Sequence, residues 1–193
     1  MALSATSRAR FNLSEARIML LEATPLGMQV LVQILSGFGA KDIVRATNTT
    51  EARDYLDVNQ FDLMVVDTLG PEGHGYDFVH WLRRSEFKMN RHVPVLMTTG
   101  HTRAADVQRA RDCGAHFIMA KPLTAIGVLE RILWIAREGR QFVECDRYVG
   151  PDRRFRDIEL PPGHPRRRRT DKIIQSALAA DAAGGEALSK VAS

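Results

Sequence analysis

Two short segments near the C-terminus share one pattern of charged residues, P-x-R-R-x-x-D. They are Pro151–Asp157 and Pro165–Asp171, and their first residues are fourteen positions apart. Paired guanidinium groups can bind a phosphate or the O6/N7 edge of guanine, and the carboxylate that follows can accept hydrogen bonds from guanine N1–H and N2–H. The repeated pattern therefore indicates an anionic ligand that contains guanine. The alternative is that an arginine-rich tract produces this pattern by composition alone and stays solvated.

The segment around this repeat is unusual in its basic residues. Between Arg147 and Arg169 there are eight arginines and no lysine, which favours planar bidentate recognition over charge attraction alone. Tyr148 or Phe155 would stack on a purine in such a site. For Tyr148 the alternative is docking against the preceding helix. The candidate nucleotide-binding residues are Arg147, Tyr148, Asp152, Arg153, Arg154, Phe155, Asp157, Arg167, Arg168 and Asp171.

Composition and charge restrict the class of protein. Hydrophobic residues make up 45% and charged residues 26% of the 193 residues, as in globular proteins. The net charge of +4 comes mostly from the tail, because residues 146–193 carry 10 Lys/Arg against 7 Asp/Glu, and residues 1–145 carry 17 against 16. No apolar run could cross a bilayer and the N-terminus lacks a signal peptide, so we expect a cytoplasmic protein. Cys113 and Cys145 have no partners in the sequence and are expected to be buried, inert thiols.

The residues before this tail predict the elements that must position any site. Residues 17–139 alternate short apolar runs with longer helical patterns, which is typical of β-α-β units. The expected fold is α/β, a flavodoxin-like, doubly wound sheet of five parallel strands. The expected strands are Arg17–Leu21, Asp42–Ala46, Phe61–Asp67, Val93–Thr98 and Ala115–Met119. The expected helices begin at the N-caps Thr24 and Asn48, and the other three cover Gly75–Phe87, Thr102–Cys113 and Leu123–Glu138.

Polar residues follow four of the predicted strands. Since the carboxyl ends of parallel strands meet at one edge of a sheet, this edge would gather Glu22, Asp67, Thr98/Thr99 and Lys121. An acid to share a magnesium ion, an aspartate nucleophile, a hydroxyl and a lysine are the groups that an acyl phosphate on Asp67 needs. Asp67 would be consumed stoichiometrically, and the six histidines show no metal-ligand spacing, so an enzyme is not predicted.

This arrangement resembles the receiver domain of two-component response regulators over residues 17–139. The matching stretches are Ile18–Glu22, Phe61–Asp67 with Pro71 and Gly75, Val93–Gly100, and Gly114–Ala115 leading to Lys121-Pro122. The resemblance implies that Asp67 is the phosphoacceptor, that Glu22 and Asp67 are magnesium ligands, that Thr99 is the switch hydroxyl and that Lys121 binds the phosphate.

Two positions depart from the family pattern. Ala23 stands where a second acid follows Glu22 in the family, which weakens the Mg²⁺ site without necessarily abolishing it. Ile118 stands where the family has a switch Tyr or Phe, and Phe117 would lie on the opposite face of the strand. The alternative to phosphorylation is a receiver fold kept as a protein-binding scaffold.

The remaining segments divide the chain around the receiver. Residues 1–16 are expected to be a flexible lead-in, with Phe11 and Leu13 able to dock on the sheet edge. Residues 140–171 are predicted to be a disordered, Arg/Pro-rich nucleotide-binding segment, because they have too few apolar residues to offset their ordering entropy without a ligand. Residues 172–193 are predicted to be an Ala-rich tail, either a short helix or disordered.

Joined to a receiver, the tail resembles that of the CheY-like cyclic di-GMP effectors of alphaproteobacteria, the Cle group. Arg154-x-x-Asp157 and Arg168-x-x-Asp171 also resemble the R-x-x-D signature that holds cyclic di-GMP in diguanylate cyclases. The resemblance implies a cyclic di-GMP adaptor that acts on a protein such as the flagellar motor, at the flagellated pole. The alternative is a stand-alone phosphorelay receiver, phosphorylated by a histidine kinase, whose basic tail is an anchor on anionic lipid or nucleic acid. No DNA-binding domain is recognisable.

Overall fold

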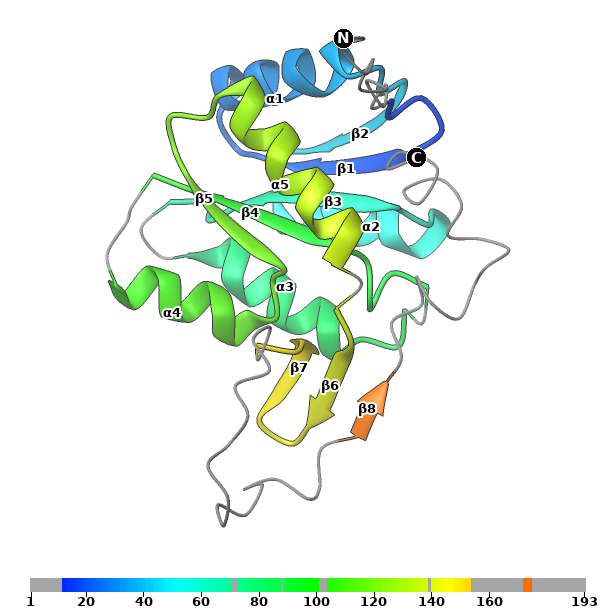
Figure 1. Cartoon of the computed structure of the whole chain (residues 1–193), viewed down its shortest axis with the longest axis vertical. Coiled ribbons are helices and arrows are strands. Elements are labelled where there is room, and N and C mark those ends of the chain that lie inside the picture. Colours follow the sequence, from blue (N-terminus) through cyan, green and yellow to red (C-terminus); the bar gives the residue numbers. More distant parts are fainter. Residues whose placement is uncertain are drawn as a thin grey trace, which may run out of the picture.

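The computed structural model describes residues 12–70, 73–87, 89–100, 104–138, 140–153 and 172–174. Five parallel strands form the main sheet in the order β2-β1-β3-β4-β5 (Figure 1). Their bounds are β1 Arg17–Leu21, β2 Asp42–Ala46, β3 Leu63–Asp67, β4 Val95–Thr99 and β5 Phe117–Ala120. The predicted fold class is confirmed. Three strands begin two residues later than predicted, and Phe61 shows why: its N–H donates to the side chain of Asn90, at 3.0 Å, and not to a neighbouring strand.

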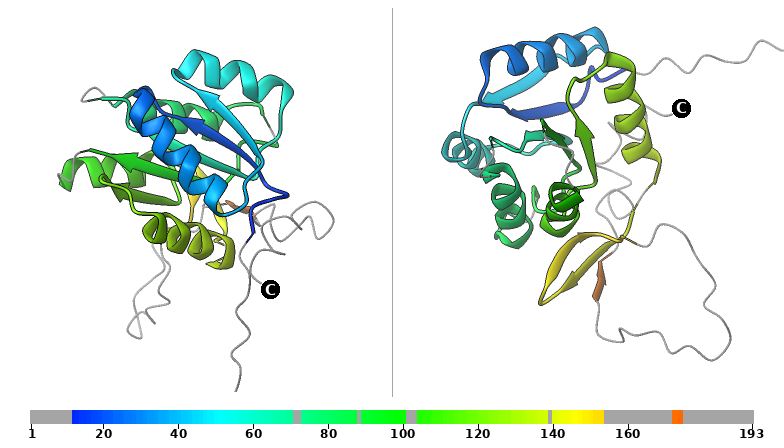
Figure 2. Two further views of the ribbon diagram at one scale, coloured as in Figure 1. Left: turned by 90° about the horizontal axis from the view of Figure 1, so that it is seen from above. Right: turned by 90° about the vertical axis from the view of Figure 1, so that its left-hand side faces the viewer.

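Five helices cover the two faces of this sheet. They are α1 Pro25–Gly37, α2 Thr49–Val58, α3 His74–Arg84, α4 Ala104–Cys113 and α5 Ala125–Glu138. α1 and α5 pack on one face, and α2, α3 and α4 pack on the other, so the core has two halves separated by the sheet (Figures 1 and 2). None of the helices in the described ranges is long and apolar enough to span a bilayer.

The two helix N-caps that the sequence predicts, Thr24 and Asn48, are confirmed. Thr24 Oγ1 accepts a hydrogen bond from Gly27 N at 3.2 Å, and Pro25 occupies the first helical position of α1. Asn48 Oδ1 accepts from Glu51 N at 2.9 Å, while the Glu51 carboxylate accepts from Thr47 N, as in a capping box. The bounds of two other helices differ from the prediction. α3 begins one residue earlier and ends three residues earlier than predicted, and α5 begins two residues later.

The predicted lead-in of residues 1–16 is too long at its C-terminal end, whereas Leu13 docks on the domain as the sequence analysis expected. Leu13 and Ala16 are 0% and 1% exposed and belong to the core on the α1/α5 face. Leu13 N also donates to Phe38 O at 2.9 Å, which ties this segment to the end of α1. Residues 12–16 are therefore part of the domain, whereas Phe11 lies outside the described residues.

The prediction of disorder from Arg140 onward is also wrong for the first part of that segment. β6 (Phe142–Cys145) and β7 (Tyr148–Pro151) form an antiparallel hairpin, and β8 (Lys172–Ile174) pairs with the other edge of β6. Lys172–Ile174 is thus a strand, where a helix or disorder was predicted. The hairpin lies against the ends of α3 and α4 (Figure 2). Its apolar residues are ordered because the receiver offers a surface on which they can be buried.

Arg83, on α3, joins the hairpin to the receiver. Its side chain is fully buried, and its three donor nitrogens bond to main-chain carbonyls: Nε to Gly114 O at 3.0 Å, Nη1 to Arg91 O at 2.7 Å and Nη2 to Val93 O at 2.9 Å. The guanidinium also lies 5.1 Å from the centre of the Phe142 ring of β6. Burial lowers the pKa of Arg83 to about 10, so it stays charged at neutral pH.

The hairpin and the receiver approach each other closely at two glycines. A Cβ on Gly150 would lie 2.7 Å from Gly114 Cα, and a Cβ on Gly114 would lie 2.4 Å from Val149 O. Gly114 also has a φ of +95°, which side chains rarely adopt. Cys113 beside it is buried, and burial raises the pKa of its thiol to about 11, which agrees with an inert residue. Cys145 is only half-buried, so its predicted burial is wrong.

Candidate functional site

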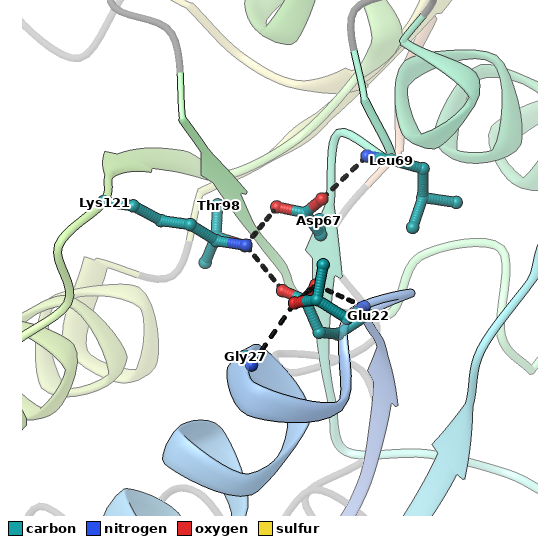
Figure 3. Close-up of polar contacts among 7 residues, drawn as sticks. Glu22, Gly27, Asp67, Leu69, Thr98 and Lys121 are labelled. Carbon is teal, nitrogen blue, oxygen red and sulfur yellow. Dashed lines mark hydrogen bonds and ion pairs between the residues drawn. The ribbon is translucent and has the colours of Figure 1, made fainter.

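The carboxyl ends of the strands bring together the residues that the sequence placed there. Glu22 follows β1, Asp67 ends β3, Thr98 lies near the end of β4, and Lys121 follows β5 (Figure 3). Thr99 is the last residue of β4. Asp67 and Thr98 are partners in the β3–β4 register, and Lys121 N donates to Thr99 O at 2.7 Å. The parallel sheet therefore fixes the relative height of these residues.

Lys121 bridges the two acids of the site. Its Nζ lies 2.6 Å from Glu22 Oε2 and 2.8 Å from Asp67 Oδ1 (Figure 3). Burial alone would lower the pKa of Lys121, but the hydrogen bonds to Asp67 and Glu22 together with their charges raise it above its usual value. One ammonium group between two carboxylates leaves the site with a net negative charge.

Glu22 is held rigidly although it is charged and only 1% exposed. Its Oε1 accepts hydrogen bonds from Thr24 N at 3.0 Å and from Thr24 Oγ1 at 2.6 Å, at the start of α1. The amino end of a helix favours a negative charge nearby. Gly27 makes this approach possible, because a Cβ there would lie 2.6 Å from the carboxyl carbon of Glu22.

Asp67 is 7% exposed, and both of its carboxylate oxygens have partners. Oδ2 accepts from Leu69 N at 2.8 Å, and Oδ1 accepts from Thr98 Oγ1 at 3.2 Å in addition to Lys121. The first turn of α3 presses on the same strand end, since a Cβ on Gly75 would lie 1.9 Å from Asp67 O. This contact couples the position of α3 to that of Asp67.

The two threonines at the end of β4 occupy different places. Thr98, one of the two hydroxyl residues predicted at this strand end, donates a hydrogen bond to Asp67. Thr99 is 2% exposed and lies beside the phenol of Tyr76 on α3, so its role as the switch hydroxyl stays a prediction. Sequence reasoning missed Tyr76, and only the alternation of side chains along β4, which sends Thr99 to the α3/α4 face, could have suggested a partner there.

The carboxylates that could hold a metal ion at this edge of the sheet are Glu22 and Asp67. The described part of the chain contains no group of three or more His, Cys, Asp or Glu side chains that could hold a metal, and Ala23 is exposed without a carboxylate to add. Magnesium often binds through one or two carboxylates and keeps its waters. The two carboxylates that share Lys121 therefore fit a magnesium ion with few protein ligands.

Ile118 and its neighbour Phe117 lie on opposite faces of β5, as predicted. Ile118 packs against the core on the α2/α3/α4 face, and Phe117 packs on the α1/α5 face. The Phe117 ring meets Trp134 of α5 edge to face, with 5.4 Å between the ring centres. Ile118 thus offers no aromatic ring or hydroxyl to the site.

Four of the predicted nucleotide-binding residues lie in or next to the hairpin. Arg147 is exposed in its turn, and Asp152 N donates to Gln141 O at 2.7 Å. Tyr148 is 8% exposed, donates from its hydroxyl to Pro151 O at 2.8 Å and lies under the Arg153 guanidinium, which is 3.9 Å from the ring centre. Arg153 Nη1 also pairs with Asp112 Oδ1 of α4 at 2.8 Å.

The alternative predicted for Tyr148, docking against the preceding helix, is correct in part. Tyr148 docks on the receiver, but β7 lies against α3 and α4 and not against the last helix α5. The other six predicted residues lie outside the described residues: Arg154, Phe155, Asp157, Arg167, Arg168 and Asp171.

Known proteins are similar to this chain in sequence and in fold. The model of the response regulator receiver domain family matches residues 18–133. The polar-differentiation response regulators DivK of Brucella anthropi and Brucella ovis are each 28% identical over 115 residues, which is 60% of this chain and 91% of theirs.

Two solved structures also have this fold. The receiver domain of a signal transduction histidine kinase from Syntrophus aciditrophicus is 28% identical with a TM-score of 0.55, over 62% of this chain and 89% of that one. The chemotaxis protein CheY4 of Vibrio cholerae, 23% identical with a TM-score of 0.54, shares the fold over 62% of this chain and 98% of its own. Because the family model spans more than half of the 193 residues, the chain belongs to the response regulator receiver family.

Proposed function

We propose that this receiver is a CheY-like signalling adaptor that binds cyclic di-GMP through residues 147–171 and then acts on a protein partner. The partner class that we favour is the flagellar motor, which would place the protein in the cytoplasm at the flagellated pole. The ligand fits the tandem motif because it carries two guanines and two phosphates, one set for each P-x-R-R-x-x-D copy.

One observation supports this proposal most strongly. β7 ends at Pro151, the first residue of the first motif copy, and β8 begins at Lys172, directly after Asp171, the last residue of the second copy. β6 lies between them in the sheet, and Pro151 and Lys172 pair with Phe142 and Glu144, two residues apart on β6, so the two ends of the motif-bearing connection are about 12 Å apart. Fixing both ends of a connection lowers the entropy that a ligand must overcome to order it.

Arg153 belongs to the first motif copy and lies within the described residues, so its surroundings are known. Since Tyr148 is buried beneath it, Tyr148 would support the Arg153 guanidinium and not stack on a base itself. The outer face of that guanidinium would then be available to a purine or a phosphate. Arg147, exposed in the hairpin turn, would add a second cation.

Calorimetric titration of the full chain tests this function. We expect cyclic di-GMP to bind, and GTP and cyclic di-AMP to bind much more weakly, because the carboxylates of the motif accept from guanine and two guanines are needed. An equal response to all three ligands would reject guanine recognition.

A pair of variants separates this function from a simple basic anchor. Asp157→Ala and Asp171→Ala make the tail more basic, so a polyelectrolyte would bind anions more tightly. Recognition of guanine predicts the reverse, a loss of about ten-fold in affinity for each variant. Binding of the wild-type chain that falls steeply with salt and ignores the identity of the anion would favour the lipid or nucleic acid anchor.

A second candidate function, phosphorylation of Asp67 by a histidine kinase, is favoured by the Lys121 bridge. Asp67 Oδ would attack the phosphorus, a new O–P bond would form, and the bond to the donor nitrogen or oxygen would break with its electron pair on the donor. A magnesium ion held by Glu22 and Asp67 would supply further neutralisation of charge. Lys121, already 2.8 Å from Asp67 Oδ1, would follow the charge onto the phosphoryl oxygens, and Thr99 would donate a hydrogen bond to one of them.

Acetyl phosphate and magnesium test this second function. Mass spectrometry should find one phosphoryl group on Asp67 in the wild-type chain and none in Asp67→Asn. Modification that never appears under these conditions would favour the protein-binding scaffold.

A further inference from the structure

An apolar groove lies at the amino edge of the sheet, opposite the carboxyl edge that holds Asp67. It has a volume of about 230 Å³ and lies between the end of α2 and the loop that joins α3 to β4. Leu56 and Phe87 line it. Val58, on α2, and Met89, on the loop, also line it and are 79% and 64% exposed. Clustered apolar side chains at a surface mark a place where another segment or molecule binds.

The groove is held in shape by Asn90, which is 2% exposed. Its Nδ2 donates to Leu56 O at 3.3 Å, and its Oδ1 accepts from Phe61 N at 3.0 Å. The Phe87 ring packs edge to face against Trp81 of α3, with 5.7 Å between the ring centres. Because these contacts form without an occupant, the groove is preformed, and binding to it requires little rearrangement.

The last described residues of the chain lie near this groove. Ile174, which ends β8, pairs with Phe142 of β6, and the Phe142 ring meets the His92 ring edge to face with 4.8 Å between the centres. His92 is only two residues after Asn90 and three after Met89. Since an extended chain covers about 3.3 Å per residue, the residues that follow Ile174 are long enough to reach the groove.

The sequence after β8 has the composition that an apolar groove accepts. Gln175–Ala180 carries no charge, and Leu178 is its one large apolar residue. Burial of Leu178 would remove apolar surface from water without removing a charge. A segment of the same chain also has a high effective concentration at the groove, which favours it over a separate partner.

β8 itself indicates that such a contact is needed. It has three residues and, among the described strands, pairs only with β6. So short a strand at the edge of a small sheet is weakly stabilised by its own pairing. A contact made by the residues directly after it would hold it in place.

We infer that Leu178 binds in this groove, between Val58 and Met89, and attaches the end of the β7-β6-β8 sheet to the receiver. The contact covers the apolar side chains at the end of α2 and fixes β8 against β6. Its effect on the ligand site rests on the proposed function: a fixed β8 holds the C-terminal end of the motif-bearing connection in place.

Oxidation of Met89 by hydrogen peroxide tests the inference. An exposed methionine sulfur is oxidised faster than a covered one, and mass spectrometry of peptides measures each methionine separately. We expect Met89 to be oxidised about five-fold faster in Leu178→Asp than in the wild-type full chain, because a charge is excluded from the groove. Val58→Asp, on the other side of the contact, should have the same effect.

The matched control is Leu26→Asp, the same substitution at a leucine that is 73% exposed on α1. It should leave the oxidation rate of Met89 at the wild-type value. Met64, which is 0% exposed, reports on folding, since its oxidation must stay slow in every variant. Equal rates for Met89 in the wild type and in Leu178→Asp would overturn the inference, because the groove would then be open or covered by another segment or a second copy.

Titration with cyclic di-GMP separates this inference from the proposed function. Leu178→Asp should bind cyclic di-GMP about three-fold more weakly than the wild type, because β8 is released. A wild-type chain that does not bind would reject the proposed function, while faster oxidation of Met89 in Leu178→Asp would still support the contact. Unchanged affinity together with faster oxidation would overturn only the effect on the ligand site.

Discussion

Two cations of the domain, Lys121 and Arg83, are satisfied in opposite ways. Lys121, at the carboxyl edge of the sheet, has a side chain that is 28% exposed and pairs with Glu22 and Asp67. Arg83, at the other end of the domain, is 0% exposed, and its hydrogen bonds all go to main-chain carbonyls of residues 91, 93 and 114.

This difference separates a cation whose partners could change charge from one whose partners cannot. The partners of Lys121 are carboxylates, and their charge would change if Asp67 accepted a phosphoryl group or Glu22 shared a metal, so the ammonium group could then move to new partners. The partners of Arg83 are carbonyls that are fixed by the fold and cannot change charge. Arg83 therefore holds the hairpin in place, and Lys121 is free to respond to chemistry.

The largest effect that this comparison predicts is in Arg83. Arg83→Met leaves three buried carbonyls without donors and loosens the contact with Phe142, so urea unfolding should show a loss of about 3 to 5 kcal/mol. Arg84→Met, next to it on the exposed side of α3, should change stability by less than about 0.5 kcal/mol. Equal values for the two variants would remove the structural role assigned to Arg83.

Lys121 should show a smaller effect on stability and a larger one on chemistry. Lys121→Met leaves Glu22 and Asp67 facing each other without a cation, and we expect a loss of about 1 to 2 kcal/mol in urea unfolding at pH 7. Phosphorylation by acetyl phosphate should fall about ten-fold or more. A variant that is phosphorylated at the wild-type rate would place Lys121 in the same structural class as Arg83.

The hairpin interface also predicts a pH dependence of stability. Burial, together with Arg83 and Arg140, holds the pKa of His116 well below its usual value, and its Nδ1 accepts from Val95 N at 3.1 Å. The unfolded chain binds a proton on this residue below about pH 6.5 while the folded chain does not, so stability is lost as the pH falls through that value. We expect a loss of about 1 kcal/mol between pH 7.5 and 5.5.

His116→Asn provides the comparison for this dependence. The amide can still accept from Val95 N but cannot take up a proton, so the variant should lose measurably less stability over the same range. His92, whose pKa is also lowered by burial, accounts for part of the remaining slope. A variant with the wild-type slope in thermal unfolding would exclude His116 as its source.

The smallest effect is expected at a third cation, Arg153, whose pairing with Asp112 is largely solvated. The two side chains are 32% and 51% exposed, so Asp112→Asn should change stability by less than about 1 kcal/mol. Since the variant releases Arg153 from α4, its affinity for cyclic di-GMP should stay equal or rise. A strong loss of affinity would mean that Asp112 positions Arg153 for the ligand.

The same comparison explains what the sequence could predict. Glu22, Asp67 and Lys121 each end or follow an apolar strand, and the rule that parallel strands gather their carboxyl ends at one edge was sufficient to bring them together. Arg83 gave no such signal, because an arginine on a helix is ordinarily exposed, and its three acceptors come from turns whose positions depend on the whole fold.

The hairpin was missed for a related reason. Phe142, Val143, Tyr148 and Val149 form two very short apolar pairs within a segment dominated by arginine, glycine and proline, and such strands are stable only on a surface that exists once α3 and α4 have packed. The place of Tyr76 beside Thr99 was not predicted either, because an aromatic residue on a helix indicates core packing and does not indicate what its hydroxyl contacts.

Nuclear magnetic resonance of the full chain, titrated with cyclic di-GMP, tests the central claim most directly. At saturation we expect the amide signals of residues 147–171 to shift together with those of β7 and β8, while signals of the distant α1 and β2 stay in place. Signals of residues 147–171 that remain unchanged in saturating cyclic di-GMP would contradict it and leave a receiver with a basic extension.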